Sequence, residues 1–182
     1  MSTNSKKIFK IVLLGEPSVG KTSLCRRYMG QGFQENYLAT LGAEFVIKEL
    51  DDVQLLIWDI GGHKNFRNIF KAYLSGSQGL ILVCDVMRPD TLANIDKWVD
   101  YYIEANNKIA PSILVTNKID LRSEDGGALQ ETDARSRLDQ LSKKYNQEFR
   151  YIETSAKTGE NIEEAFENLI DWLLEVYLGK TR

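Results

Sequence analysis

Short runs of apolar and β-branched residues alternate along the chain with longer segments in which apolar residues recur at helical spacing. The short runs predict six strands, over residues 9–14, 44–50, 53–58, 80–84, 112–116 and 149–153. The longer segments predict helices over about 21–29 and 66–74, one that begins near Asp90, and one that follows Asn161. Strands that alternate with helices are typical of an α/β fold, in which a largely parallel sheet carries helices on both faces.

The second and third predicted strands differ from the others because only Asp51 and Asp52 separate them. A crossover between parallel strands needs a dozen or more residues, so these two strands should form an antiparallel hairpin. Lys48 and Glu49, in the second strand, suit an exposed edge, because charged side chains oppose pairing with another chain.

Two of the predicted helices have a clear apolar face. The helix that begins near Asp90 carries one apolar stripe, made of Leu92, Ile95, Trp98, Val99, Tyr102 and Ile103. Asn161 is the expected N-cap of the last helix, with Glu164 three residues further on. The expected buried face of that helix consists of Ile162, Phe166, Leu169, Ile170, Leu173 and Leu174. Residues 123–130 are polar and contain glycine, so we expect an exposed loop without a function.

Length and charge place the chain among ordinary globular domains. Its 182 residues fit one domain, 1–182, which begins with a short polar arm, 1–7. The net charge is −3 and the basic residues are not clustered, so neither nucleic acid nor an anionic lipid surface is indicated as a partner. We expect a monomer.

Cysteine usage and the two ends predict a cytoplasmic protein. Cys25 and Cys84 are expected to be buried free thiols in a reducing compartment. The start of the chain is not a signal peptide, and no apolar stretch is long enough to span a bilayer. Ser2 excludes N-myristoylation, and no cysteine near Arg182 is available for prenylation. Peripheral attachment to a membrane would require a lipidated tail beyond Arg182.

The first motif with a clear chemistry is Gly15-Glu16-Pro17-Ser18-Val19-Gly20-Lys21-Thr22, which directly follows a predicted strand and precedes a helix. This is the phosphate-binding loop pattern, whose backbone N–H groups wrap a di- or triphosphate at the start of a helix. In such a loop Lys21 reaches the β- and γ-phosphates, and the Thr22 hydroxyl ligates Mg²⁺. The motif predicts that the chain binds a nucleoside phosphate.

Three further motifs lie at the ends of predicted strands, where an open parallel sheet binds its ligands. Asp59, followed by Ile60-Gly61-Gly62, can hold Mg²⁺, and a flexible glycine there lets a backbone N–H meet the γ-phosphate. The second is Asn117-Lys118-Ile119-Asp120, in which a carboxylate can accept two hydrogen bonds from guanine. Adenine has no such pair of donors and would leave the carboxylate desolvated and unpaired.

The same motif offers two further contacts. Lys118 can lay its aliphatic stem along the base, and Asn117 can tie this segment to the phosphate loop.

The third motif is Thr154-Ser155-Ala156-Lys157, where the Ala156 N–H could donate to guanine O6.

With these four motifs in this order, the chain resembles the Ras superfamily of small GTPases over essentially its whole length, and most of all the Rab-type branch. The segments Leu56-Ile57-Trp58-Asp59 and Glu153-Thr-Ser-Ala-Lys-Thr-Gly-Glu-Asn161 carry the same resemblance. It implies a P-loop GTPase domain with a six-stranded sheet in the order 2-3-1-4-5-6 and one antiparallel strand. It also implies GTP or GDP as the bound nucleotide and Mg²⁺ as the cofactor.

The resemblance implies two segments, about 33–42 and 61–73, whose shape depends on the γ-phosphate. In the first, Phe33 would pack across the guanine edge, Tyr37 would close over the phosphates, and Thr40 would ligate Mg²⁺ only in the triphosphate state. Read without the family, this segment is a polar loop and Thr40 an ordinary loop residue.

The resulting site assignments are these. Expected metal ligands are Thr22, Thr40 and Asp59, and expected catalytic residues are Lys21, Thr40, Gly62 and His63. Expected nucleotide-binding residues are Gly15, Glu16, Pro17, Ser18, Val19, Gly20, Lys21, Thr22, Ser23, Phe33, Tyr37, Thr40, Gly62, Asn117, Lys118, Asp120, Ser155, Ala156 and Lys157.

Two positions and one segment depart from the family pattern. His63 stands where a glutamine usually orients the attacking water. A neutral imidazole could do this, but nearby phosphates should raise the pKa of His63, and a cation cannot accept a proton. The alternative is a solvent-exposed histidine with no catalytic part. Pro17 removes one backbone donor from the loop. No Arg or Lys lies between Phe33 and Ala43, so a charge-stabilising arginine in cis is not expected there.

These observations predict a GTP-binding molecular switch that hydrolyses GTP slowly and binds effectors through its two switch segments. Exchange factors and GTPase-activating proteins are its expected regulators. The alternative is a GTP-binding interaction module with negligible hydrolysis, because of His63. A small-molecule kinase is a more distant alternative, since the sequence has no evident second substrate site or lid.

Overall fold

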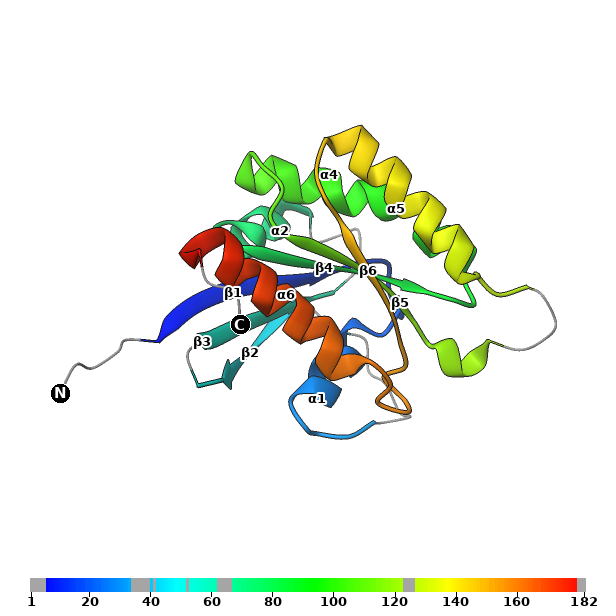
Figure 1. Ribbon diagram of the computed structural model, residues 1–182, viewed down its shortest axis with the longest axis horizontal. Coiled ribbons are helices and arrows are strands. Elements are labelled where there is room, and N and C mark those ends of the chain that lie inside the picture. Colours follow the sequence, from blue (N-terminus) through cyan, green and yellow to red (C-terminus); the bar gives the residue numbers. More distant parts are fainter. Residues whose placement is uncertain are drawn as a thin grey trace.

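The computed structural model describes residues 6–33, 40, 42–51, 53–61, 67–122 and 127–179, with only the backbone described for 67–70. Six strands form a single sheet in the order β2-β3-β1-β4-β5-β6 (Figure 1). The strands are β1 (Lys7–Leu14), β2 (Ala43–Glu49), β3 (Val53–Ile60), β4 (Gly79–Asp85), β5 (Ser112–Asn117) and β6 (Arg150–Thr154). Among these described strands, β2 alone runs antiparallel to its neighbour. The predicted fold class and strand order are confirmed.

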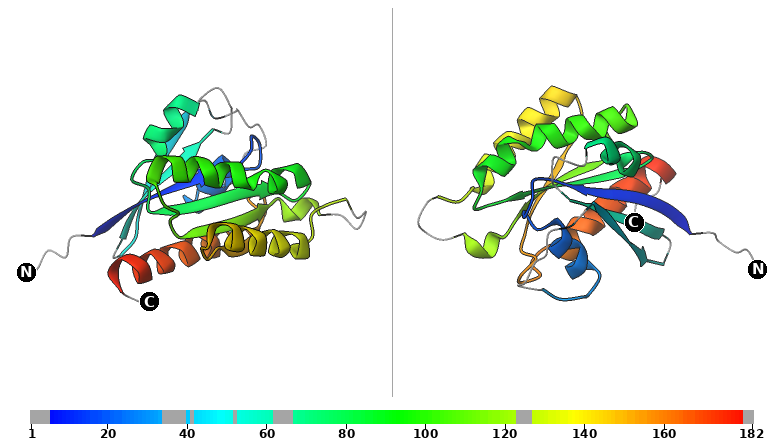
Figure 2. Two further views of the ribbon diagram at one scale, coloured as in Figure 1. Left: turned by 90° about the horizontal axis from the view of Figure 1, so that it is seen from above. Right: turned by 180° about the vertical axis from the view of Figure 1, so that it is seen from behind.

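The helices lie on both faces of this sheet, with α4 and α6 on opposite sides (Figure 2). They are α1 (Lys21–Tyr28), α2 (Arg67–Leu74), α3 (Pro89–Ala93), α4 (Ile95–Asn106), α5 (Glu131–Tyr145) and α6 (Ile162–Leu178), together with the 3₁₀ helix η2 (Ile119–Leu121). None of the described helices is long and apolar enough to cross a membrane.

Two hydrophobic clusters form the core, one on each face of the sheet. Alternate residues of β1 enter different clusters: Ile11 and Leu13 pack with α1 and α6, whereas Val12 and Leu14 pack on the face covered by α3, α4 and α5. A strand buried on both faces reads as a continuous apolar run, which is why β1 could be found from the sequence.

The two cysteines also lie in this core. Cys25 and Cys84 are buried free thiols, as expected. Burial raises the pKa of both thiols.

Strand β1 starts earlier than predicted. It begins at Lys7, because the parallel ladder with β3 extends to the Lys7–Val53 pair. Lys7 therefore belongs to the sheet and not to the expected arm over 1–7, of which residues 1–5 lie outside the described part of the chain.

The helix expected near Asp90 is interrupted. Asn94 separates α3 from α4, and its side chain accepts a hydrogen bond from Lys97 Nζ at 2.6 Å. Asparagine has a low helix propensity, and the Asn94 backbone N–H ends α3 by donating to the Asp90 carbonyl at 3.0 Å. The predicted apolar stripe of this region is buried, except that Ile103 is only partly covered.

Helix α5 was not predicted, because its apolar face is thin. Only Ala134 and Leu141 of its 15 residues are buried. Its start does carry a local signal, since the Asp133 carboxylate accepts the Gln130 N–H at 2.9 Å. The segment before it, expected to be an exposed loop, is exposed only in part: Ala128 and Leu129 are buried, and residues 123–126 lie outside the described part.

At the start of α6, the side chain of Asn161 makes a different hydrogen bond from the one predicted. Asn161 does precede the helix, but its side chain makes no capping bond there. Its Nδ2 donates instead to the Glu153 carbonyl at the end of β6, at 2.9 Å. The predicted buried face of α6 is confirmed.

The hairpin of β2 and β3 is confirmed, with β2 at the sheet edge. Glu49 is exposed, whereas Lys48 is partly covered. Lys48 Nζ donates to the Tyr28 carbonyl at 3.1 Å and lies over the Tyr28 ring.

Candidate functional site

The four motifs converge at the carboxyl ends of the strands. Strand β1 lies between β3 and β4 in the sheet: the connection after β1 leads to the β2–β3 side, and the connection after β3 leads to β4 on the other side. Such a switch point is where open parallel sheets bind ligands. The loop after β1 therefore has Asp59 of β3 on one side and the ends of β4 and β5 on the other.

Two glycines let the phosphate loop fold against its neighbours. Both have a positive φ, 153° at Gly15 and 103° at Gly20. A Cβ at Gly15 would lie 2.2 Å from the Val83 carbonyl oxygen, and one at Gly20 would lie 2.2 Å from Asn117 Nδ2. Only glycine fits at these two positions, which is the physical basis of the motif.

Lys21 begins α1 and turns back under the loop. Its Nζ donates to the carbonyl oxygens of Gly15 and Glu16, at 2.9 Å each. Burial lowers the pKa of Lys21 to about 8, against the opposing effects of Asp59 and Glu16. The negative charge of a bound phosphate would favour the protonated form again.

Three oxygen-bearing side chains from three separate segments meet beside Lys21. The Thr22 hydroxyl donates to Asp59 Oδ2 and lies 2.8 Å from the Thr40 hydroxyl. Thr40 Oγ1 lies 3.5 Å from the same carboxylate oxygen. All three residues are buried, and burial raises the pKa of Asp59.

The fit of this cluster to a metal ion can be judged from its atoms. Asp59 Oδ1 is buried and has no hydrogen-bond partner within the described part of the chain. One carboxylate and two hydroxyls are the hard oxygen donors that Mg²⁺ takes together with substrate phosphates. The three predicted metal ligands therefore fit Mg²⁺.

The close approach of two chain segments also shapes this cluster. The Gly61 N–H donates to the Gly42 carbonyl at 2.9 Å, and a Cβ at Gly61 would lie 2.4 Å from the Thr40 carbonyl oxygen. A side chain here would push Thr40 away from Thr22.

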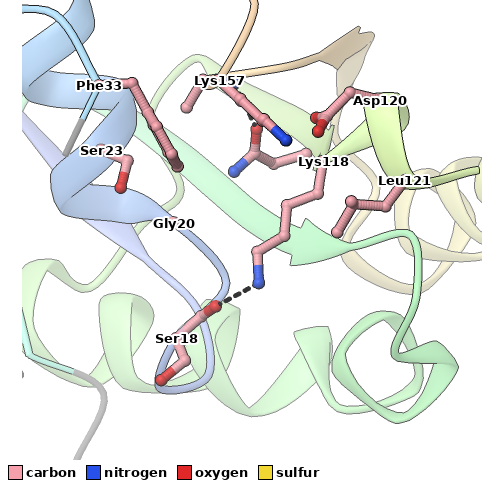
Figure 3. Close-up of a pocket in the computed structure, with 10 residues that line it drawn as sticks. Ser18, Gly20, Ser23, Phe33, Lys118, Asp120, Leu121 and Lys157 are labelled. Carbon is pink, nitrogen blue, oxygen red and sulfur yellow. Dashed lines mark hydrogen bonds between the residues drawn. The ribbon is translucent and has the colours of Figure 1, made fainter. Parts of the chain in front are cut away.

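A cavity of about 470 Å³ lies on the other side of the loop (Figure 3). Its lining residues are Ser18, Gly20, Ser23, Phe33, Asn117, Lys118, Asp120, Leu121, Ala156 and Lys157. Phe33 enters from one side and Asp120 from the other, with the stem of Lys118 between them. The structure thus brings the predicted base-binding residues to one cavity.

Asn117 joins three of the motifs. Its Nδ2 donates to the Val19 carbonyl at 2.9 Å, which is the expected tie to the phosphate loop. Its Oδ1 accepts from Thr154 Oγ1 at 3.2 Å and from the Ala156 N–H at 3.1 Å. A guanine O6 would have to share or replace that last bond.

Neighbouring side chains hold both Asp120 and Lys118 in place, the first by a hydrogen bond and the second by an ion pair. Ser155 Oγ donates to Asp120 Oδ1 at 2.5 Å. Lys118 has a φ of 69°, and its Nζ donates to the Ser18 carbonyl at 2.8 Å and pairs with Asp85 Oδ2 at 2.6 Å. Both side chains are thereby oriented without any ligand.

A model of the Ras family matches residues 10–175 of the chain. The chain belongs to the Ras family. Ras-related protein Rab7 of Drosophila melanogaster is 35% identical over 184 residues, covering 97% of this chain and 85% of the fly protein. The Ypt/Rab-type GTPase ypt7 of Schizosaccharomyces pombe is 34% identical, covering 96% of this chain and 86% of the yeast protein. The predicted Rab-like resemblance is confirmed, and this Ras-family member is a GTP hydrolase.

A third relative is much longer. The Ras and EF-hand domain-containing protein homolog of Mus musculus is 37% identical over 165 residues. These residues are 88% of this chain but 26% of the mouse protein, so this Ras-family chain spans about a quarter of that relative.

Three predicted site residues of this Ras-family GTPase, Tyr37, Gly62 and His63, lie outside the described residues. Of the first expected switch segment, 33–42, the structure describes residues 33, 40 and 42.

Sequence reasoning missed three residues of the Ras-family site. Leu121 lines the cavity and is 46% exposed, and its position directly after Asp120 was the available signal. Asp85 is 2% exposed and pairs with Lys118. Arg88 Nη1 donates to the Pro17 carbonyl at 2.8 Å. No motif marks the last two, because their partners are distant in the sequence.

Proposed function

We propose that this Ras-family GTPase is a molecular switch that binds Mg²⁺-GTP and Mg²⁺-GDP, hydrolyses GTP slowly, and binds effectors through the segments 33–42 and 61–73. The observation that carries the proposal is the meeting of Thr22, Thr40 and Asp59. Thr40 belongs to a segment outside the sheet, so a ligand bound at this cluster would control where that segment lies.

The chain's own groups divide the work at the phosphates. The N–H groups of the loop and the Lys21 ammonium would hold the β- and γ-phosphates, with Gly62 providing a further N–H to the γ-phosphate. Thr22, Thr40 and Asp59 would hold Mg²⁺, which would supply positive charge beside the phosphates. Thr40 would join only when the γ-phosphate is present.

The cavity beside the loop would take the nucleoside. Asp120 would accept the two guanine donors, the Lys118 stem would lie along the base, and Phe33 would cover its edge. Ser155 supports this role for Asp120 by holding one of its oxygens. Tyr37 would close over the phosphates.

A row of aromatic side chains supports effector binding next to the second switch segment. Phe45 and Trp58 stack at 5.1 Å between ring centroids, and Trp58 lies 5.4 Å from Tyr73. Phe45 is 55% exposed. Partly exposed aromatics are enriched in protein interfaces. Exchange factors and GTPase-activating proteins would act on the same face. The protein would bind its nucleotide as a monomer.

His63 decides between this proposal and its alternative. If His63 positions the attacking water, the wild type hydrolyses bound GTP by itself. If His63 takes no part, the protein is an interaction module controlled by exchange or partner binding, with negligible hydrolysis. This second function is a candidate because His63 stands where the family usually has a glutamine.

Single-turnover hydrolysis of pre-bound GTP, in wild type and His63→Gln, separates the two functions. We expect a slow, Mg²⁺-dependent wild-type rate that changes by less than about tenfold in His63→Gln, because both side chains can hold the water. A wild-type rate at the level of free GTP that rises in His63→Gln would favour the interaction module and refute a catalytic role for His63.

A further inference from the structure

Every backbone carbonyl from Gly15 to Val19 in the phosphate loop accepts a hydrogen bond from a side chain. Lys21 binds the first two, and the remaining three are bound by side chains from the ends of β4 and β5. The three donors are Arg88 to Pro17, Lys118 to Ser18, and Asn117 to Val19, at 2.8 to 2.9 Å. Carbonyls held on one side of a turn leave the N–H groups to line the other side, which is the arrangement that binds anions.

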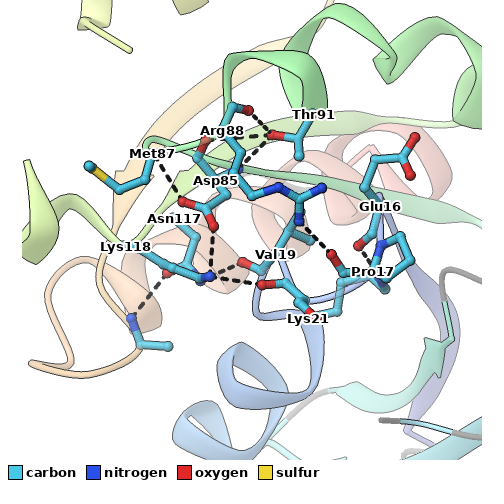
Figure 4. Close-up of polar contacts among 12 residues, drawn as sticks. Glu16, Pro17, Val19, Lys21, Asp85, Met87, Arg88, Thr91, Asn117 and Lys118 are labelled. Carbon is cyan, nitrogen blue, oxygen red and sulfur yellow. Dashed lines mark hydrogen bonds and ion pairs between the residues drawn. The ribbon is translucent and has the colours of Figure 1, made fainter. Parts of the chain in front are cut away.

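Arg88 is the one donor of this set that lies in no motif. It joins two segments 71 residues apart, and Figure 4 shows its guanidinium reaching across to Pro17. Pro17 has no N–H, so its carbonyl is its only backbone hydrogen-bonding group. The fixation of this part of the loop therefore depends on that oxygen.

The loop needs fixing at this point because the next residue is strained. Ser18 has a φ of 63°, in the left-handed region that a non-glycine residue rarely adopts. Arg88 holds the peptide before Ser18, and Lys118 holds the carbonyl after it. The two cations thus bracket the strained residue.

The turn that carries Arg88 is itself rigid. The Arg88 N–H donates to the Asp85 carbonyl at 2.9 Å, and Thr91 Oγ1 donates to the Arg88 carbonyl at 2.6 Å. The guanidinium also lies 3.4 Å from the Asp90 carboxylate. Asp85 pairs with Lys118 as well, so both donors to the loop are anchored at the end of β4 (Figure 4).

We propose that Arg88 is a positioning residue, which holds the Pro17–Ser18 part of the phosphate loop in its phosphate-binding conformation. The inference rests on the proposed nucleotide function of the same loop. Because Arg88 contacts the loop backbone, its effect is the same for a diphosphate and a triphosphate. A cation that acted on the γ-phosphate would instead affect GTP alone.

The test is the dissociation rate of fluorescently labelled GDP and of a labelled, non-hydrolysable GTP analogue, with Mg²⁺ present. We expect Arg88→Ala to release both nucleotides about tenfold faster and by the same factor, the size of one hydrogen bond from a charged group. Arg88→Lys, which keeps one cationic donor, should restore part of the difference. The matched control is Arg135→Ala, which removes an arginine paired with Glu131 on the surface of α5.

The outcomes separate the claims. Unchanged GDP dissociation in Arg88→Ala, or faster release of the GTP analogue alone, would refute the positioning role. Equal acceleration in Arg135→Ala would refute it too, since the effect would then be general destabilisation. The unfolding temperature without nucleotide should match wild type in all three variants. If the wild type itself bound neither guanine nucleotide, the proposed function would fail instead.

Discussion

At the scale of single residues, the site depends on close approaches that exclude most side chains. Gly20 and Asn117 illustrate this best, because the Asn117 amide occupies the space in which any Cβ at position 20 would lie. That amide ties the loop to β5 and β6 through Val19, Thr154 and Ala156. A change at Gly20 should therefore disturb the cavity lined by Asn117 as well as the phosphate loop.

Gly20→Ala should lower the affinity for GDP at least about 100-fold, because displacing Asn117 breaks several buried hydrogen bonds at once. Fluorescence titration with labelled GDP measures this. Gly30→Ala is the matched control: Gly30 also has a positive φ, of 76°, but a Cβ there has no atom of the described residues within 4 Å. Similar losses in both variants would mean that backbone strain, and not the Asn117 contact, is responsible.

Sequence reasoning reached most residues of the site because each motif is local. The phosphate loop and the Asn117–Asp120 segment are continuous in the sequence and follow recognisable strands. Arg88 and Asp85 could not be found in this way, since their roles exist only once β4 lies beside β1. The hydrogen bond from the Ala156 N–H to Asn117 could not be found from the sequence either, because it depends on how β5 and β6 lie in space.

At the scale of elements, the segment after β5 is fastened to β6 by an ion pair outside the predicted motifs. Arg122 donates to both carboxylate oxygens of Glu153, at 2.6 and 3.0 Å, and to the Leu129 carbonyl at 3.0 Å. The Arg122 guanidinium holds the pKa of Glu153 below its ordinary value of 4.5. This pair fixes the segments that carry Asp120 and Ser155.

The pair predicts a dependence of stability on pH. A carboxyl group whose pKa is lower in the folded state stabilises the fold above its unfolded pKa, and this stabilisation is lost as pH falls through the folded pKa. The Glu153 contribution should therefore be complete at pH 7 and fade below about pH 4.5. Urea unfolding of wild type and Glu153→Gln, at pH 7 and below about pH 4.5, measures this contribution to the free energy of unfolding.

The variant should be less stable than wild type by about 1 kcal/mol at pH 7, and the difference should shrink in acid. Glu148→Gln is a suitable control, because Glu148 lies near the same strand and its side chain is 61% exposed in its pair with Arg150. A stability difference for Glu153→Gln that stays constant with pH would contradict the assignment.

Elements with a strong apolar pattern could be predicted, and those without one could not. The buried faces of β1 and α6 are explicit in the sequence, and both were found. Helix α5 buries two residues along its length, so tertiary contacts rather than periodicity place it against α3 and β6. The break at Asn94 could not be predicted either, because the apolar stripe continues across it from Leu92 to Ile95.

At the scale of the whole molecule, the strand order explains why one end of the sheet can bind a nucleotide. Strand β1 is flanked by β3 and β4. The loop after β1 therefore has Asp59 of β3 on one side, and on the other side Arg88 and Lys118, which are both bonded to Asp85 of β4. The oxygen cluster and the 470 Å³ cavity lie on either side of that loop. A single ligand that spans both would connect Thr40 to the rigid sheet.

The central claim is that this single ligand is a guanine nucleotide read by Asp120. The most direct test is a comparison of the affinities of wild type and Asp120→Asn for GDP and for xanthosine diphosphate. An amide replaces one acceptor by a donor, which matches the extra carbonyl of xanthine. We predict that wild type prefers GDP and that Asp120→Asn prefers xanthosine diphosphate, with each ratio at least about 100-fold. An unchanged preference for GDP in Asp120→Asn would contradict the account.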